Sequence, residues 1–337
     1  MTAAEIIDIL ENSIDANVLS VLLADHASGK NIIWATDDYA AFGEGYDFQS
    51  EITVEKITGE NGMIIKPRTE KDKKEQTRRV RDKAEVFTPS WVCNAQNNLV
   101  DNAWFGKTAN RFNKEVGQSW ESTYARKDPS DRRDRIKFPN KPGKTWEDYV
   151  RATRLEVSCG EAPYLTSRYD TVTGEYIKVK RRIGLLDRKL RVIAENTDTW
   201  QAWLKWAKVA LQHTYGFEWQ GDNVLLAREN LLFTVIEHYH SVYGRGIPKK
   251  TLLQFAEIIS WNVFQMDGLK YVIPESCVPI VEHEISLFGD ITTYTPCPGC
   301  KKNDCRQHTG IYATVMDWNE KKTIRFVDLL NGGKTNG

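Results

Sequence analysis

The chain has 337 residues, and its 46 Lys and Arg balance 46 Asp and Glu, so the formal net charge is zero. This balance argues against a uniformly basic, histone-like nucleic-acid binder and against a disordered polyelectrolyte. With 41% hydrophobic residues and 11 Trp, the chain can bury a substantial core and is expected to form one large domain or two modest ones. No apolar run reaches the roughly 18 residues of a membrane span, and the acidic, amphipathic N-terminus is not typical of a signal peptide. We therefore predict a cytoplasmic protein without a membrane partner.

The neutral sum hides an uneven distribution of charge. The net charge is −10 over residues 1–65, +9 over residues 66–154 and +1 over residues 155–337. A mixed-sign run such as residues 71–83 is most often a solvated helix face or a linker, and contact with nucleic-acid phosphates is the alternative. The acidic segment could cover a functional surface or mimic DNA, and the sequence leaves both roles open.

Residues 1–65 are predicted to form a small α+β segment. Apolar residues at helical spacing predict a helix over residues 3–15, and short strands are expected over residues 18–25 and 30–36. A charged linker over residues 66–83 follows. Pro89 then marks the start of a helix. Residues 107–150 lack a clear period and indicate an insertion or long loop.

From about residue 153 onwards, strands and helices alternate. Strands that end in turns are predicted within residues 154–165, 215–232 and 258–269, and helices over residues 199–212 and 249–259. Such alternation predicts an α/β fold with a mostly parallel sheet, whose ligand site lies at the C-terminal ends of the strands. Residues 84–337 are expected to form this domain.

Four segments of this region resemble, in the same order, the motifs of the S-adenosylmethionine-dependent DNA adenine-N6 methyltransferases, especially the modification subunits of restriction systems. They are Phe87-Thr88-Pro89, the glycine turn within residues 155–165, the strand ending at Glu218 and the segment around Asp267. The resemblance covers roughly residues 78–337. It implies a Rossmann-like core that binds S-adenosylmethionine and transfers its methyl group to adenine N6 in DNA. It implies cofactor-binding roles for Phe87, Thr88, Pro89, Glu156, Ser158, Cys159, Gly160, Glu218 and Asp267.

The chemistry of these residues agrees with the resemblance. A strand that ends in Cys159-Gly160 lets the backbone approach a ligand closely, and an acid at the next strand end suits a ribose diol. Asp187 is a rival for that acid because it lies 27 residues after Gly160, whereas Glu218 lies 58 residues after it; about 20 is usual. The simpler alternatives are a tight turn at Gly160, a solvent-exposed acid at Glu218 and a turn at Asp267.

Besides the 58-residue spacing from Gly160 to Glu218, the chain departs from the family in two places. Ala162 stands where the family has its second glycine, and no Asn-Pro-Pro occurs anywhere. In the family, N-P-P-Y/F holds the target amine and stacks on the flipped base. The nearest equivalent is a last strand predicted over residues 323–333, in which Asp328 and Asn331 are the candidates for holding the adenine amine.

Three functions follow as expectations. The first is an active modification subunit that acts on DNA. The second is a degenerate or split methyltransferase that binds DNA or a partner, where a second chain supplies target recognition and the N-P-P-Y region. The third and weakest is a restriction component whose acidic N-terminal segment has a separate activity.

A zinc knuckle is predicted within residues 294–312. Three cysteines and a histidine there have the spacing C-x2-C-x4-C-x2-H: Cys297, Cys300, Cys305 and His308. Thiolates favour zinc over hard ions, and four protein ligands leave no open coordination position, so the site is predicted to be structural. Reduced free thiols are the alternative. Cys277 is interpreted as a small core residue rather than as a nucleophile.

Overall fold

A computed structural model of the chain describes residues 11–83, 85–106, 111–124, 135–139, 141–286 and 289–331. Helices and small sheets make up these ranges, which confirms an α/β fold. The helices are α2 (Ala16–Leu23), α3 (Val54–Ile57), α4 (Lys73–Lys83), α5 (Ser90–Phe105), α6 (Trp146–Arg151), α7 (Leu185–Asn196), α8 (Trp200–Gln212), α9 (Gly221–Tyr243), α10 (Lys249–Asn262) and α11 (Pro298–Lys302). The strands are β1 (Ala24–Asp25), β2 (Lys30–Asn31), β3 (Asn113–Val116), β4 (Ser119–Ser122), β5 (Arg154–Val157), β6 (Thr214–Glu218), β7 (Val263–Gln265), β8 (Ile280–Ser286), β9 (Gly289–Thr295), β10 (Thr314–Asp317) and β11 (Lys322–Arg325).

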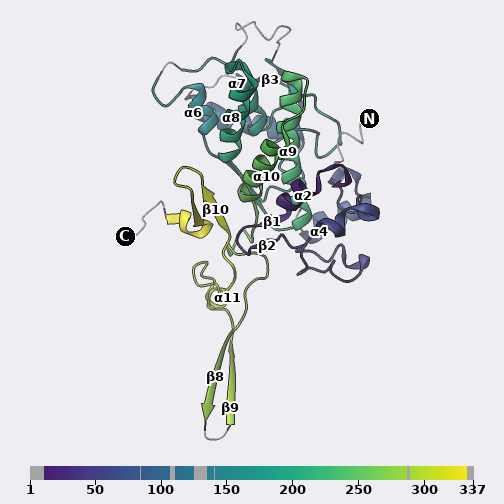
Figure 1. Cartoon of the computed structure of the whole chain (residues 1–337), viewed down its shortest axis with the longest axis vertical. Coiled ribbons are helices and arrows are strands. Elements are labelled where there is room, and N and C mark those ends of the chain that lie inside the picture. The colour runs from purple at the N-terminus through teal and green to yellow at the C-terminus, as the bar shows by residue number, and fades with distance from the viewer. Residues whose placement is uncertain are drawn as a thin grey trace.

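The central sheet has the order β5-β6-β7, and both strand pairs are parallel, as predicted. Glu156 lies opposite Gly216, and Phe217 lies opposite Phe264. Helices α7 and α8 connect β5 to β6, and α9 and α10 connect β6 to β7. Because successive crossovers that step in one direction have the same hand, their helices cover one face of the sheet. Figure 1 shows these four helices gathered in the upper part of the molecule, where they pack on one another.

The N-terminal segment belongs to the same hydrophobic core as the helices around the sheet. The strand predicted over residues 18–25 was wrong, because most of it forms α2. Asp15 caps this helix by accepting a hydrogen bond from the backbone N–H of Asn17 at 3.1 Å. The apolar face of α2 packs on α10, and Trp34 is fully buried. The helix predicted over residues 3–15 lies largely outside the described residues.

The charged linker predicted over residues 66–83 is largely the helix α4, which is anchored by a buried arginine. The side chain of Arg79 is 1% exposed. Its guanidinium contacts Asp38 at 3.0 Å, Glu85 at 2.7 Å and Asp222 at 2.9 Å. A buried cation with three acidic partners thus connects the N-terminal segment, α4 and the start of α9. Arg79 is the buried residue of α4, and most of the other residues of this helix are exposed, as expected for a solvated helix face.

The predicted long loop over residues 107–150 contains regular structure. Strands β3 and β4 form a hairpin, and α6 begins with a capping box in which the side chains of Thr145 and Asp148 bond to each other's backbone N–H. Residues 107–110, 125–134 and 140 lie outside the described part of the chain.

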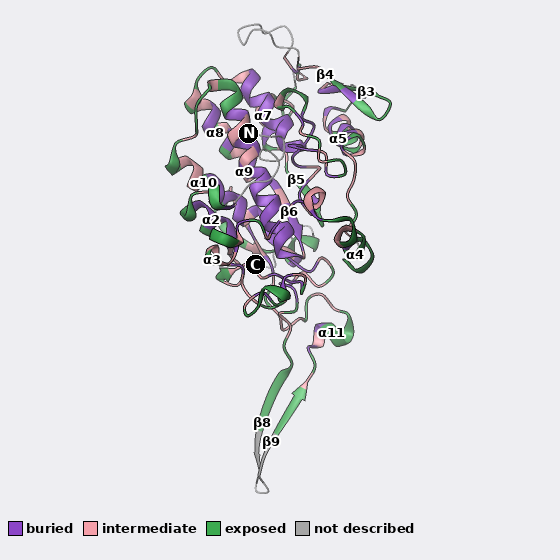
Figure 2. Cartoon of the chain, turned by 90° about the vertical axis from the view of Figure 1, so that its right-hand side faces the viewer, coloured by how far each residue is buried: buried purple, intermediate pink, exposed green. Residues whose placement is uncertain are grey.

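Two hairpins follow the central sheet. The hairpin β8–β9 projects from the body as a narrow arm (Figures 1 and 2), and β10–β11 packs through Val315 against Phe217 and Phe264 of the sheet. The last strand predicted over residues 323–333 is confirmed only up to Arg325, where β11 ends. Asp317 caps a turn that reverses the chain, so β11 pairs antiparallel with β10, and a 3-10 helix follows over Phe326–Asn331.

None of the helices among the described residues combines the length and the apolar character needed to cross a membrane.

Candidate functional site

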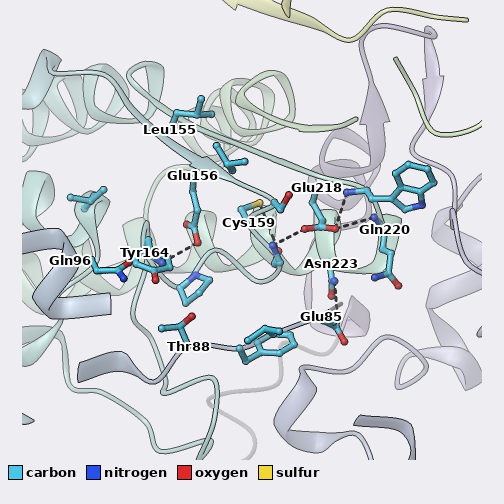
Figure 3. Close-up of a pocket in the computed structure, with 18 of the residues that line it drawn as sticks. Glu85, Thr88, Gln96, Leu155, Glu156, Cys159, Tyr164, Glu218, Gln220 and Asn223 are labelled. Carbon is cyan, nitrogen blue, oxygen red and sulfur yellow. Dashed lines mark hydrogen bonds between the residues drawn. The ribbon is translucent and has the colours of Figure 1, made fainter. Parts of the chain in front are cut away.

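A cavity of about 640 Å³ lies beside the C-terminal ends of β5 and β6 and is bordered by α5 and the start of α9 (Figure 3). This volume is within the usual range of small-molecule sites, about 300–1,000 Å³. Of the nine residues to which the resemblance gives cofactor roles, seven line it: Phe87, Thr88, Glu156, Ser158, Cys159, Gly160 and Glu218. Three separate segments of the chain therefore meet at the strand ends.

The turn after β5 has an unusual backbone. Ser158, Gly160 and Ala162 all have positive φ angles, of 48°, 53° and 61°. A non-glycine residue in this left-handed region costs about 1–2 kcal/mol, and such strain is concentrated at ligand sites. Ala162 thus adopts a glycine-like conformation where the family has its second glycine. A methyl group added at Gly160 would meet only the ring of Phe87, at 4.0 Å, so this turn leaves space for a ligand beside it.

Glu218 holds the two strand ends together at the cavity. Its carboxylate accepts hydrogen bonds from the backbone N–H groups of Gly160 at 2.9 Å, Trp219 at 2.8 Å and Gln220 at 3.3 Å. Burial raises the pKa of Glu218, although these three bonds oppose the shift. The residue is 8% exposed, so it is not an ordinary surface acid. A carboxylate has about four acceptor positions, which leaves room for a further donor from a ligand.

Glu156 is a second buried acid in the wall of the cavity. Its oxygens accept the backbone N–H groups of Tyr164 at 3.3 Å and Leu165 at 3.1 Å. Burial raises the pKa of Glu156 to about 8, and the nearby charge of Glu218 contributes to the increase. Two acids that are costly to ionise together favour a ligand that brings positive charge.

Two predicted cofactor residues do not line this cavity. Pro89 caps α5 and lines a neighbouring cavity instead. Asp267 accepts the backbone N–H groups of Leu269 at 2.9 Å and Lys270 at 3.0 Å, so it forms the turn that was the simpler alternative.

The two candidate ribose acids are separated by the fold. Asp187 lies buried in the first turn of α7, where it bonds to the backbone N–H of Ser167 and to the ring of His238, both at 2.9 Å. It is not a lining residue of the cavity, whereas Glu218 is. Asp187 therefore has a structural role, because it connects α7 to Ser167 and to His238 of α9 by buried hydrogen bonds.

Asp328, one of the two predicted catalytic residues, does not line the cavity. Asp328 lies in the 3-10 helix after β11, and its carboxylate pairs with the guanidinium of Arg325 at 2.9 and 3.0 Å. The side chain of Asn331 lies outside the described part of the structure. The reversal at the β10–β11 turn carries this segment away from the parallel ladder, which overturns its proposed equivalence to a sheet strand.

Several residues of the cavity wall are not among the predicted site residues. Asn223 at the start of α9 donates to Glu85 at 2.7 Å, and both line the cavity. Gln96 and Asn97 contribute from α5. The cluster of amide side chains over residues 94–98 is unusual for a helix and was the signal that could have identified α5 as a site element.

A second group of functional side chains lies at the base of the β8–β9 arm. The ligand atoms of Cys277, Cys297, Cys300 and His308 all lie within 4.8 Å of one another, and such a group could hold a metal ion such as zinc. Cys277, expected to be a core residue, occupies the place predicted for Cys305. The chain between Cys277 and Cys297 forms the β8–β9 arm. Because the arm is a hairpin, its two ends lie close together, and Cys297 lies near Cys277.

The surroundings of Cys297 favour the thiolate form of its side chain. Burial opposes its ionisation, but hydrogen bonds from Thr309, Cys300 and His308 lower its pKa to about 5. The backbone N–H of Thr309 lies 3.2 Å from its Sγ. Because the thiolate is the form that binds metals, this environment suits a ligand.

Comparison of the chain with protein-family models, curated proteins and solved structures gave no match.

Proposed function

We propose that the cavity beside β5 and β6 binds S-adenosylmethionine. We further propose that the chain is a DNA methyltransferase of the modification-subunit type, which methylates adenine at N6. The observation that carries the proposal is the meeting of seven predicted residues around one cavity of suitable size. These seven residues come from three separate segments of the chain, residues 87–88, residues 156–160 and Glu218, and all three segments border the same cavity. The net charge of +9 over residues 66–154 is consistent with a DNA substrate.

The residues of the cavity have roles that match the chemistry of this cofactor, which supplies an electrophilic methyl group on a positively charged sulfur. Glu218 would accept from the ribose hydroxyls, because it ends the neighbouring parallel strand. Phe87 and Thr88 would border the methionine end. The buried acids Glu156 and Glu218 would favour the sulfonium charge over the neutral sulfur of the demethylated product.

A second candidate is a chain that binds the cofactor but needs a partner for methyl transfer. The open edge of β5 favours it. Within the described sheet, β5 pairs only with β6, and alternate residues of a parallel strand bond to the same neighbour. The backbone groups of Leu155 and Val157 therefore point to the free edge, and their side chains are 43% and 63% exposed.

At the other end of the sheet, the N-terminal segment lies beside β7. The amide of Gln265 in β7 makes two hydrogen bonds with the backbone of Ile33, both at 2.9 Å. An unprotected apolar edge is a template for another strand. A strand from a second chain could therefore extend the sheet beside the cavity and supply the missing N-P-P-Y region and target recognition.

Calorimetric titration of the full chain with S-adenosylmethionine tests cofactor binding. We expect Glu218→Gln to weaken binding by about 10- to 100-fold, because hydrogen bonds to a charged group contribute about 1.5–3 kcal/mol. The exposed Glu60→Gln variant is the matched control and should bind like the unmodified chain. Equal affinity of all three proteins, or no binding by the unmodified chain, would reject the proposal.

Transfer of labelled methyl groups to unmethylated DNA then separates the two candidates. Transfer by the chain alone supports the complete enzyme. Binding without transfer supports the chain that needs a partner or has lost activity.

A further inference from the structure

We infer that the four-residue cluster is a structural zinc site whose fourth ligand is Cys277 rather than Cys305, and that the zinc joins both ends of the β8–β9 arm to the body. This inference does not depend on cofactor binding, because no residue of the cluster lines the cavity beside β5 and β6.

The spacing of the ligand atoms matches a tetrahedral zinc site. The Nδ1 atom of His308 lies 3.4 Å from the Sγ of Cys277 and 3.6 Å from each Sγ of Cys297 and Cys300. Zinc–sulfur and zinc–nitrogen bonds of about 2.3 and 2.05 Å, at tetrahedral angles, place these atoms about 3.6 Å apart. The three distances from the imidazole nitrogen therefore agree with one ion at the centre of the cluster, and all pairs of ligand atoms lie within 4.8 Å.

The loop of Cys277 is fastened to the histidine loop by contacts that are independent of the ligand atoms. The hydroxyl of Ser276 accepts the backbone N–H of Ile311 at 3.0 Å, and the hydroxyl of Thr309 donates to the carbonyl of Val278 at 2.5 Å. These bonds lie on both sides of Cys277. The fold thus presents this thiol at the cluster whether or not an ion is bound.

Two glycines allow the close approach of the ligand loops. A methyl group at Gly299 would lie 2.6–2.7 Å from atoms of His308, and one at Gly310 would lie 3.1 Å from the Sγ of Cys277. Side chains larger than hydrogen would separate the loops at both places. The tight turn that contains Cys297 and Cys300 therefore packs directly against the imidazole ligand.

The position of the site explains how the arm is supported. Cys277 lies three residues before β8, and Cys297 lies two residues after β9. A two-stranded hairpin alone is at best marginally stable in water, and the arm projects from the body (Figure 2). An ion that binds both ends removes conformational freedom from the unfolded arm, as loop closure does generally. A knuckle with Cys305 as its third thiolate would leave the N-terminal end of the arm without a ligand.

The test compares two single-cysteine variants of the full chain. We expect about one zinc per chain in the unmodified protein and in Cys305→Ser, and a loss of zinc affinity of more than about 100-fold in Cys277→Ser, measured by competition with a chelator. Cobalt-loaded protein provides an independent readout: its visible thiolate absorption should correspond to three sulfur ligands in Cys305→Ser and to two in Cys277→Ser.

Hydrogen exchange of the arm tests the mechanical role. Residues 271–300 contain no Lys or Arg, so trypsin does not cut there, and exchange over β8 and β9 is the better probe. Exchange should accelerate in Cys277→Ser and on chelation, but not in Cys305→Ser, while far-ultraviolet dichroism shows that the body stays folded. Zinc loss in Cys305→Ser with retention in Cys277→Ser, or a failure of the unmodified chain to bind added zinc, would overturn the inference.

Discussion

Replacing Arg79 by alanine is expected to lower the free energy of unfolding by about 3–5 kcal/mol, the usual cost of removing one partner from a buried ion pair. The guanidinium has three buried acidic partners, and the side chain of Asp222 has no exposed surface. Burial would raise the pKa of Asp222, but Arg79 and Lys71 hold it well below its ordinary value. Without Arg79, the buried carboxylate of Asp222 would lose a counter-charge, and either its protonation or the entry of water into the core would lower the stability of the folded state. Urea unfolding at neutral pH measures the change.

Arg81→Ala is the matched control on the same helix. Its side chain is 77% exposed and pairs with its neighbour Asp82 at 2.6 Å, so its removal should lower stability far less than removal of Arg79 does. Similar small losses in both variants would show that the network around Arg79 contributes little. The Arg79 variant should also lose more stability at neutral pH than at acidic pH, because Asp222 loses the guanidinium that lowers its pKa and becomes protonated more readily as the pH falls.

Gly221→Ala is expected to destabilise the protein by about 3 kcal/mol or more, at the upper end of the range for overpacked cores. The added methyl would lie 2.0 Å from the carbonyl oxygen of Ile33 and 2.9 Å from the side chain of Ile52. That carbonyl accepts from Gln265, and the N–H of Gly221 donates to the carbonyl of Trp34 at 3.0 Å. Relief of the clash must therefore separate the N-terminal segment from both α9 and β7.

Gly246→Ala provides the comparison for the glycine substitution. An added methyl there meets nothing within 4 Å, so thermal unfolding of this variant should match that of the unmodified protein to within about 0.5 kcal/mol. If Gly221→Ala unfolded at the same temperature as Gly246→Ala, the close contact between Gly221 and Ile33 would not exist in solution.

Both predictions bear on the acidic N-terminal segment. Its net charge of −10 suggested an intramolecular cover or a DNA mimic, for which deletion of residues 1–65 would be the natural test. Trp34 and the apolar face of α2 are part of the main core, however. Deletion would expose that core, so charge substitutions at exposed acids such as Glu44 and Glu60 are the better test of DNA competition.

The sequence by itself determined the α/β class, the parallel strands and seven of the residues that line the cavity. Residues 154–157 and 214–218 have the local signals of strands that end in turns, and the ends of adjacent parallel strands meet at one edge. Motif order therefore sufficed to place Gly160 and Glu218 in the same site. The helices over residues 199–212 and 249–259 were predicted from the spacing of their apolar residues. Each helix buries one face, and this burial requires apolar residues at helical spacing.

Only the tertiary structure decided which partners distant residues find. Arg79 looked like part of a solvated run, because the sequence does not show that three acids from other segments surround it. Asp187 remained a rival of Glu218 as the ribose acid until the fold enclosed Asp187 in α7 and placed Glu218 in the cavity wall. Cys277 replaced Cys305 because an intervening hairpin brings the chain back to the same point. The local sequence pattern specifies the conformation of each segment. Contacts between side chains that are distant in sequence depend instead on how the helices and strands pack. Both candidate sites of this protein are formed by contacts of this second kind.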